Sequence, residues 1–62
     1  MLPNIYQVVL VNVAGMTIYS GFMEDIAFGI AENSGFECNI LLDGKLIASY
    51  SPISGFKEFT ND

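Results

Sequence analysis

The stretch that decides the fold is residues 36–51, FECNILLDGKLIASYS, which predicts a β-hairpin. Apolar and polar residues alternate from Phe36 to Leu42, the pattern of a strand with one buried face. Asp43-Gly44 comes next, and these two residues suit the central positions of a type I′ turn, where φ is positive. Lys45 to Ser51 is then the returning strand. Pro52 ends it, because proline has no N–H to donate to a neighbouring strand.

A second hairpin is predicted near the N-terminus. β-Branched residues dominate from Ile5 to Val13 and place apolar side chains on both faces, so we expect a central strand there. Ala14-Gly15 has the composition of a tight turn. Met16 to Ser20 is the expected partner strand, antiparallel to the first.

Between the two hairpins, residues 22–33 have the periodicity of an amphipathic helix. Gly35 follows, where a glycine suits the left-handed position that ends many helices. Gly29 costs roughly 1 kcal/mol relative to alanine inside a helix, and we expect close packing on the sheet to be the reason for it. The apolar arc of the helix is predicted to contain Phe22, Met23, Ile26, Ala27 and Ile30.

These elements predict a single α+β domain over residues 1–62, in the order β-β-α-β-β. The expected sheet has four strands, is mainly antiparallel and carries one helix packed on one face. A β-grasp-like arrangement and a swapped dimer are the alternatives. Residues 53–62 are left as a tail that contains two aromatic residues, Phe56 and Phe59.

Composition limits the classes of function. The chain is 52% hydrophobic and 15% charged, so it should fold. Seven acids against two lysines give a net charge of −5, which repels nucleic acid and anionic membranes and favours a partner protein with a basic surface. With no histidine and one cysteine, Cys38, the chain cannot assemble a zinc site or a histidine acid–base site. We expect no enzyme, no metal and no cofactor.

The expected location is the cytoplasm. The N-terminal residues lack the positive charge of a secretory signal, and the apolar run from Val8 to Val11 is far shorter than the roughly 20 residues of a membrane-spanning helix. Cys38 shares a strand face with Phe36 and Ile40. We therefore expect a buried and chemically inert thiol.

One candidate contact for a partner is Phe28. It projects outside the apolar arc of the helix and lies one turn from Glu24 on one side and from Glu32 on the other. An aromatic ring flanked by carboxylates is a suitable hot spot for a basic or amphipathic partner, although single exposed apolar residues are also common.

The sheet face that the helix leaves uncovered is a second candidate surface. With a two-residue turn at Asp43-Gly44, Leu41 faces Leu46, and Glu37 faces Tyr50, on that face. The resulting apolar patch of Leu41, Leu46 and Tyr50 predicts a homo-oligomer. In a monomer, the tail would instead have to fold back over this face.

A small-ligand site is the alternative. Tyr50, Ser51 and Ser54 lie in a small polar segment whose backbone N–H groups are suited to cradling an anion, such as a nucleotide signal held at an oligomer interface. The scarcity of Lys and Arg disfavours this, because phosphate recognition usually recruits those residues.

Three runs of the sequence carry a resemblance to a known class. They are IYQVVLVN with the following Gly15, IYSG at residues 18–21, and DGK at residues 43–45 with ASYSP at residues 48–52. In these runs and in its layout the chain resembles small phage-encoded accessory proteins, which are short, acidic, single-domain chains, often β-β-α-β-β, that bind host factors.

This resemblance implies a non-enzymatic inhibitor of a host factor or defence component, in the host cytoplasm, and it implies no catalytic residue. The acidic residues of this chain are less dense than those of the DNA-mimicking members of that group. A structural subunit of a larger assembly would show the same apolar patch.

Overall fold

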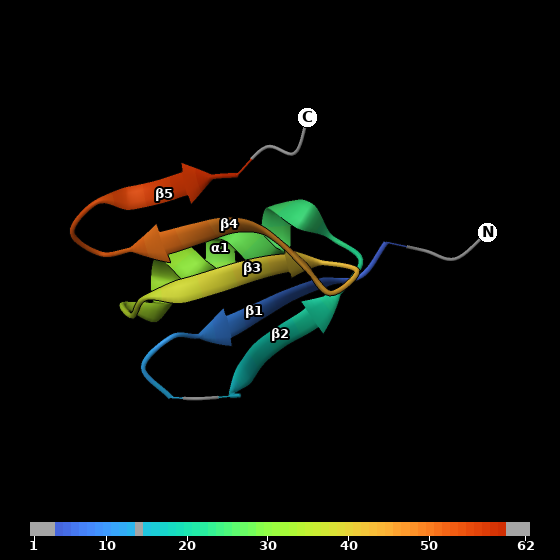
Figure 1. Cartoon of the computed structure of the whole chain (residues 1–62), viewed down its shortest axis with the longest axis horizontal. Helices are drawn as coiled ribbons and strands as arrows, with labels where there is room; N and C mark the ends of the chain where they lie inside the picture. The colour runs from blue at the N-terminus through green and yellow to red at the C-terminus, as the bar shows by residue number, and fades with distance from the viewer. Residues whose placement is uncertain (1–3, 14, 60–62) are drawn as a thin grey trace.

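The computed structural model describes residues 4–13 and 15–59 and consists of two layers, a sheet with one helix behind it (Figure 1). The sheet order is β2-β1-β3-β4-β5, and every neighbouring pair is antiparallel. The predicted α+β class is confirmed, but the predicted count of four strands is wrong. The elements are β1 (Tyr6–Leu10), β2 (Thr17–Gly21), α1 (Glu24–Ser34), β3 (Cys38–Leu42), β4 (Lys45–Ser51) and β5 (Gly55–Glu58).

The fifth strand is built from residues that we expected to form a tail. The chain turns after β4, and Gly55 supports the turn with a φ of 81°, a value that residues with a Cβ rarely adopt. β5 then runs antiparallel along β4, with Tyr50 opposite Phe56 and Ala48 opposite Glu58. Over residues 53–59, the part of the tail that the structure describes, the chain therefore extends the sheet by one strand at its edge and does not fold over the uncovered face.

The first hairpin has shorter strands than the sequence pattern predicts. β1 ends at Leu10, and the backbone N–H of Leu10 donates to the carbonyl of Met16 at 2.9 Å. β2 begins only at Thr17, so the connection between the two strands is longer than the expected two-residue turn. Ala14 of that predicted turn lies outside the described residues. β1 itself lies between β2 and β3, as expected for a strand that is apolar on both faces.

The second hairpin confirms the prediction made from Asp43-Gly44. Both residues have positive φ, 53° at Asp43 and 84° at Gly44, as a type I′ turn requires. The turn also holds the start of β1. The backbone N–H of Asp43 donates to the carbonyl of Ile5, and the N–H of Ile5 donates to Asp43 Oδ1, both at 2.9 Å.

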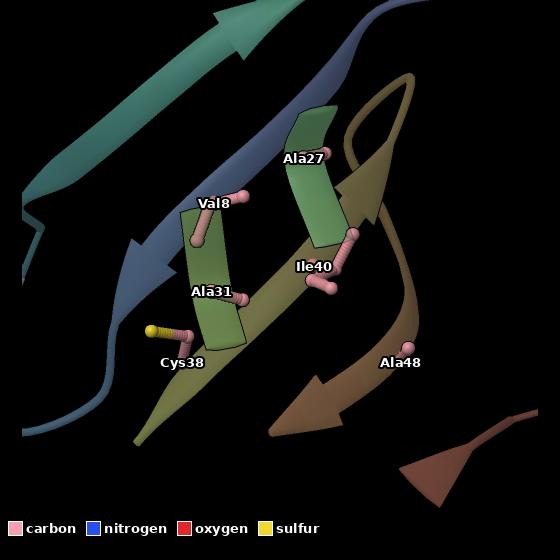
Figure 2. Close-up of a cluster of buried hydrophobic side chains, with 6 residues drawn as sticks. All are labelled: Val8, Ala27, Ala31, Cys38, Ile40 and Ala48. Carbon is pink, nitrogen blue, oxygen red and sulfur yellow. The ribbon is translucent and has the colours of Figure 1, made fainter. Parts of the chain in front are cut away.

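The core lies between α1 and the sheet, and Figure 2 shows its six fully buried side chains. The two helical members are alanines, Ala27 and Ala31, so the helix backbone can approach the strands closely. The helix lies against β1, β2 and β3. The expected apolar arc is correct at Ala27 but wrong at Phe22, Met23 and Ile26, which are exposed. The buried side chains are Val8, Ala27, Ala31, Cys38, Ile40 and Ala48.

Two glycines of the helix region have different physical roles. Gly35 has a φ of 77° and ends α1 in the left-handed conformation, as predicted. Gly29 lies within the helix, and a Cβ added there would meet no described atom within 4 Å. Close packing on the sheet is therefore not the reason for Gly29, and that expectation is wrong.

Replacing Gly29→Ala should raise the free energy of unfolding by up to about 1 kcal/mol, because alanine restricts the unfolded chain and fits the space. The matched control Gly35→Ala should lower it by a similar amount, because its positive φ strains a side chain. Urea unfolding followed by circular dichroism measures both values. A loss of stability in Gly29→Ala would show that the position is sterically restricted after all.

Candidate functional site

Phe28 belongs to an aromatic cluster and is not an exposed contact. Its ring centroid lies 5.2 Å from that of Phe56, and the rings of Phe56 and Tyr50 lie 4.7 Å apart. Phe28 is partly buried against the core. The expectation of an outward ring between Glu24 and Glu32 is wrong, because β5 brings Phe56 to that side of the helix. Both carboxylates remain on the exposed helix surface.

Tyr50 also belongs on the helix side of the sheet. Leu41 pairs with Leu46 as predicted, but the register then shifts, so Ile40 pairs with Ala48 and Cys38 with Tyr50. A one-residue bulge moves every following side chain to the other face. The expected pairing of Glu37 with Tyr50 is therefore wrong, and Tyr50 does not belong to the uncovered face.

The uncovered face is consequently more polar than expected. Asn39, Ser49 and Lys57 occupy neighbouring strands in one row, and Val9 continues this row on β1. The next row pairs Gln7 with Leu41 and Leu41 with Leu46. Of the predicted patch, Leu41 and Leu46 remain on this face and Tyr50 is absent from it. The apolar area there is smaller than the oligomer prediction assumed.

The three residues of the ligand hypothesis do come together. Tyr50, Ser51 and Ser54 line one cavity of about 350 Å³, and Glu37 and Lys57 line it as well. The Nζ atom of Lys57 also lies 5.8 Å from the ring centroid of Phe59, within the range of a cation–π contact. This cavity therefore combines hydroxyl groups with one charge of each sign.

A second cavity, of about 330 Å³, adjoins the first and was not predicted from the sequence. Glu37 and Ser51 line both cavities. Phe36, Pro52 and Ile53 line the second cavity, beside the polar residues Asn12, Glu37 and Ser51. Phe36 is 57% exposed, and Ile53, in the β4–β5 turn, is 96% exposed. We call the two adjoining cavities the loop-end groove.

The loop-end groove depends on connections between elements, which explains why sequence patterns missed it. Phe36 lies in the α1–β3 connection and Ile53 in the β4–β5 turn, seventeen positions apart along the chain. Ile53 itself was the one residue in the sequence that could have indicated the groove. A large apolar residue in a turn, beside proline and serine, is too far from the core to be buried in it.

Cys38 is fully buried, as predicted. Its Sγ lies 3.3 Å from Ser34 Oγ and 3.4 Å from the carbonyl oxygen of Phe36. Ser34 Oγ in turn donates to the carbonyl of Ala31 at 2.7 Å and accepts from the N–H of Phe36 at 3.1 Å. These contacts hold the end of the helix against the start of β3, so the thiol takes part in packing.

Within residues 4–13 and 15–59, no three histidine, cysteine or carboxylate side chains lie close enough together to hold a metal ion. No helix in the described part of the chain is long and apolar enough to cross a membrane.

Comparisons with known proteins do not assign a family. No family model, curated protein or solved structure matches this chain. We therefore derive the function from the surfaces that the fold creates, chiefly the loop-end groove.

Replacing Phe28→Ser should lower the free energy of unfolding by about 2 to 3 kcal/mol, because it removes a ring that packs on Phe56. The control Phe36→Ser should change it by less than about 0.5 kcal/mol, since that ring is mostly exposed. Thermal unfolding compares the two variants. Equal melting temperatures for Phe28→Ser and the unmodified protein would contradict the packing.

Cys38→Ala should cost about 1 kcal/mol of stability, because it leaves a small void in the core. The native thiol should react with a bulky maleimide only as fast as the protein opens. Mass spectrometry over time measures the labelling, with urea-unfolded protein as the fast reference. Labelling of the native protein at the unfolded rate would show an accessible thiol.

Proposed function

We propose that this chain is a non-enzymatic binding protein that occupies a surface of another protein through the loop-end groove. The observation that carries the proposal is the convergence of Phe36 and Ile53, two exposed apolar side chains from different segments, on one cavity of about 330 Å³. Protein interfaces are anchored by such side chains at pockets, surrounded by polar groups that seal the rim.

The energetics favour a partner at this position. Moving a large apolar side chain from water into an interface contributes roughly 1.5–3 kcal/mol, so Phe36 and Ile53 together supply several kcal/mol towards association. Pro52 lies between β4 and Ile53 and restricts the turn. A restricted turn loses less conformational entropy on binding, so more of the burial energy becomes affinity.

The charge of the chain indicates the character of the partner. Glu37 lines both cavities, and the net charge of the chain is −5. A partner that inserts an apolar side chain and carries Lys or Arg beside it would match both features. Long-range attraction would also raise the rate of association with such a surface.

The biological setting that we propose follows from the resemblance to small phage-encoded accessory proteins. An acidic chain of 62 residues, folded around one helix and a sheet, suits a role as an inhibitor of a host factor or defence component in the host cytoplasm. Such a protein acts by covering a surface on its target, so it needs a recognition patch and no catalytic group.

Binding of a small ligand is the second candidate, and one observation favours it. Ser51, Ser54 and Lys57 line one cavity of about 350 Å³ together with Tyr50, whose ring packs on Phe56 on the helix side. A ligand held there would use the cavity that Lys57 lines, whereas a protein partner would use chiefly the cavity that Phe36 and Ile53 line.

The test is a pull-down from bacterial lysate with four immobilised chains: the unmodified protein, Phe36→Ser, Ile53→Ser and the control Ile5→Ser. Ile5 is also exposed, but it lies at the start of β1, at the other end of the strands. We expect one protein whose recovery falls about tenfold in Phe36→Ser and Ile53→Ser and is unchanged in Ile5→Ser. Equal recovery by all four chains would contradict the proposed surface.

Native mass spectrometry of the purified protein distinguishes binding of a small ligand from binding of a protein. A retained small molecule that is lost on Ser51→Ala, without any captured protein, would favour the ligand function and contradict the protein-binding one.

A further inference from the structure

The two edges of the sheet differ in chemistry. β5 contains Lys57 and Glu58 within four residues, and Pro52 lies in the turn before it. Charged residues and proline at an edge strand discourage pairing with another chain. β2, at the other edge, reads Thr-Ile-Tyr-Ser-Gly and has neither a charge nor a proline. The β2 edge is therefore the one that is open to strand pairing.

The helix shows the same asymmetry. Ala27 is buried against the sheet, and Phe28, about 100° further round the helix, reaches Phe56 on the β5 side. Ile26 precedes Ala27 and so projects about 100° the other way, towards the β2 side. Ile26 is 46% exposed. Phe56 of β5 covers Phe28. In the part of the chain that the structure describes, no strand lies beyond β2, so no strand covers Ile26.

Further apolar side chains extend this exposed region towards the start of the helix. Phe22 is 63% exposed and Met23 is 56% exposed, and both follow directly after β2. We define the β2 flank as the outer edge of β2 together with Phe22, Met23 and Ile26. A sixth strand beside β2 would satisfy the unpaired backbone groups of the edge and would bury Ile26 beneath it.

The β2 flank is free of charge although the chain carries −5. At 100° per residue, Asp25, Glu32 and Glu24 project about 100° to 160° away from Ile26 around the helix. The residues that make up this flank therefore offer a basic partner no carboxylate of their own. An uncharged apolar surface fits a partner that is itself uncharged and apolar at the contact.

We infer that the β2 flank is the interface of a homodimer, in which the β2 strands of two copies pair antiparallel about a twofold axis. A second copy meets each requirement, because it supplies an uncharged strand edge. A twofold rotation also brings the same apolar side chains to the contact from the opposite direction. The pairing joins two five-stranded sheets into one, and the Ile26 side chains of the two copies close over the joint.

The dimer contact is separate from the surface of the proposed function. The loop-end groove lies at the ends of the strands where β3 begins and β4 ends, whereas the dimer contact runs along the side of β2. Dimerisation therefore leaves both grooves free.

Sedimentation of the full chain from micromolar to millimolar concentration tests the dimer. We expect a species of twice 6.8 kDa. Ile26→Glu should raise the dimer dissociation constant at least about a hundredfold, because it places like charges opposite each other across the twofold axis. The matched control Ile53→Glu adds the same charge at a 96% exposed position and should leave the dissociation constant unchanged. Circular dichroism checks that both variants are folded.

Met23→Glu is the second variant in case Ile26→Glu does not fold, since Met23 precedes the helix and is exposed. A chain that stays at 6.8 kDa at every concentration would overturn the dimer. So would a dimer that survives both Ile26→Glu and Met23→Glu. Dissociation by Leu46→Glu alone would instead place the contact on the uncovered sheet face and would equally overturn pairing through β2.

Discussion

A single short helix has to cover one face of five strands, and the rest of the structure depends on this constraint. Five strands about 4.8 Å apart span roughly 19 Å, whereas a helix with its side chains is about 10 Å wide. α1 packs Ala27 and Ala31 against Val8 and Ile40 and lies against β1, β2 and β3, so it is displaced from the centre of the sheet towards β2. Its main contacts do not extend to β4 and β5. Phe56 packs on Phe28 on the β5 side, whereas Ile26, on the opposite side of the helix, stays exposed.

Features that depend on local backbone chemistry could be predicted from the sequence. Asp43 and Gly44 both adopt positive φ, and Gly35 ends the helix in the left-handed conformation, because few other residues tolerate these angles. The α+β class followed from the change of hydrophobic period between the hairpins. Burial of Cys38 followed from alternation along its strand.

Features that depend on contacts between distant segments could not be predicted in the same way. One extra residue in β4 turns Tyr50 to the helix side, and no local pattern marks that bulge. A helical projection places Phe28 outside the apolar arc because it contains no information about β5, which supplies Phe56. Of the candidate site, Tyr50, Ser51 and Ser54 line one cavity, as expected of neighbours in sequence. Phe36 and Ile53 were missed because only the folded chain brings them together.

The proposed dimer and the proposed partner surface reinforce each other through geometry. Pairing along β2 gives a continuous sheet in which the two copies run in opposite directions, so one loop-end groove lies at each end of the assembly. A target that presents two equivalent surfaces, or that is itself an oligomer, would be held at both. Once one groove is bound, the second binding event is intramolecular, and its strength depends on effective concentration. The sheet fixes the distance between the two grooves. Only targets whose two binding surfaces are separated by the same distance would therefore gain affinity in this way. In the proposed dimer, a chain of this size would thus bind selectively even though each groove offers only a few anchoring side chains.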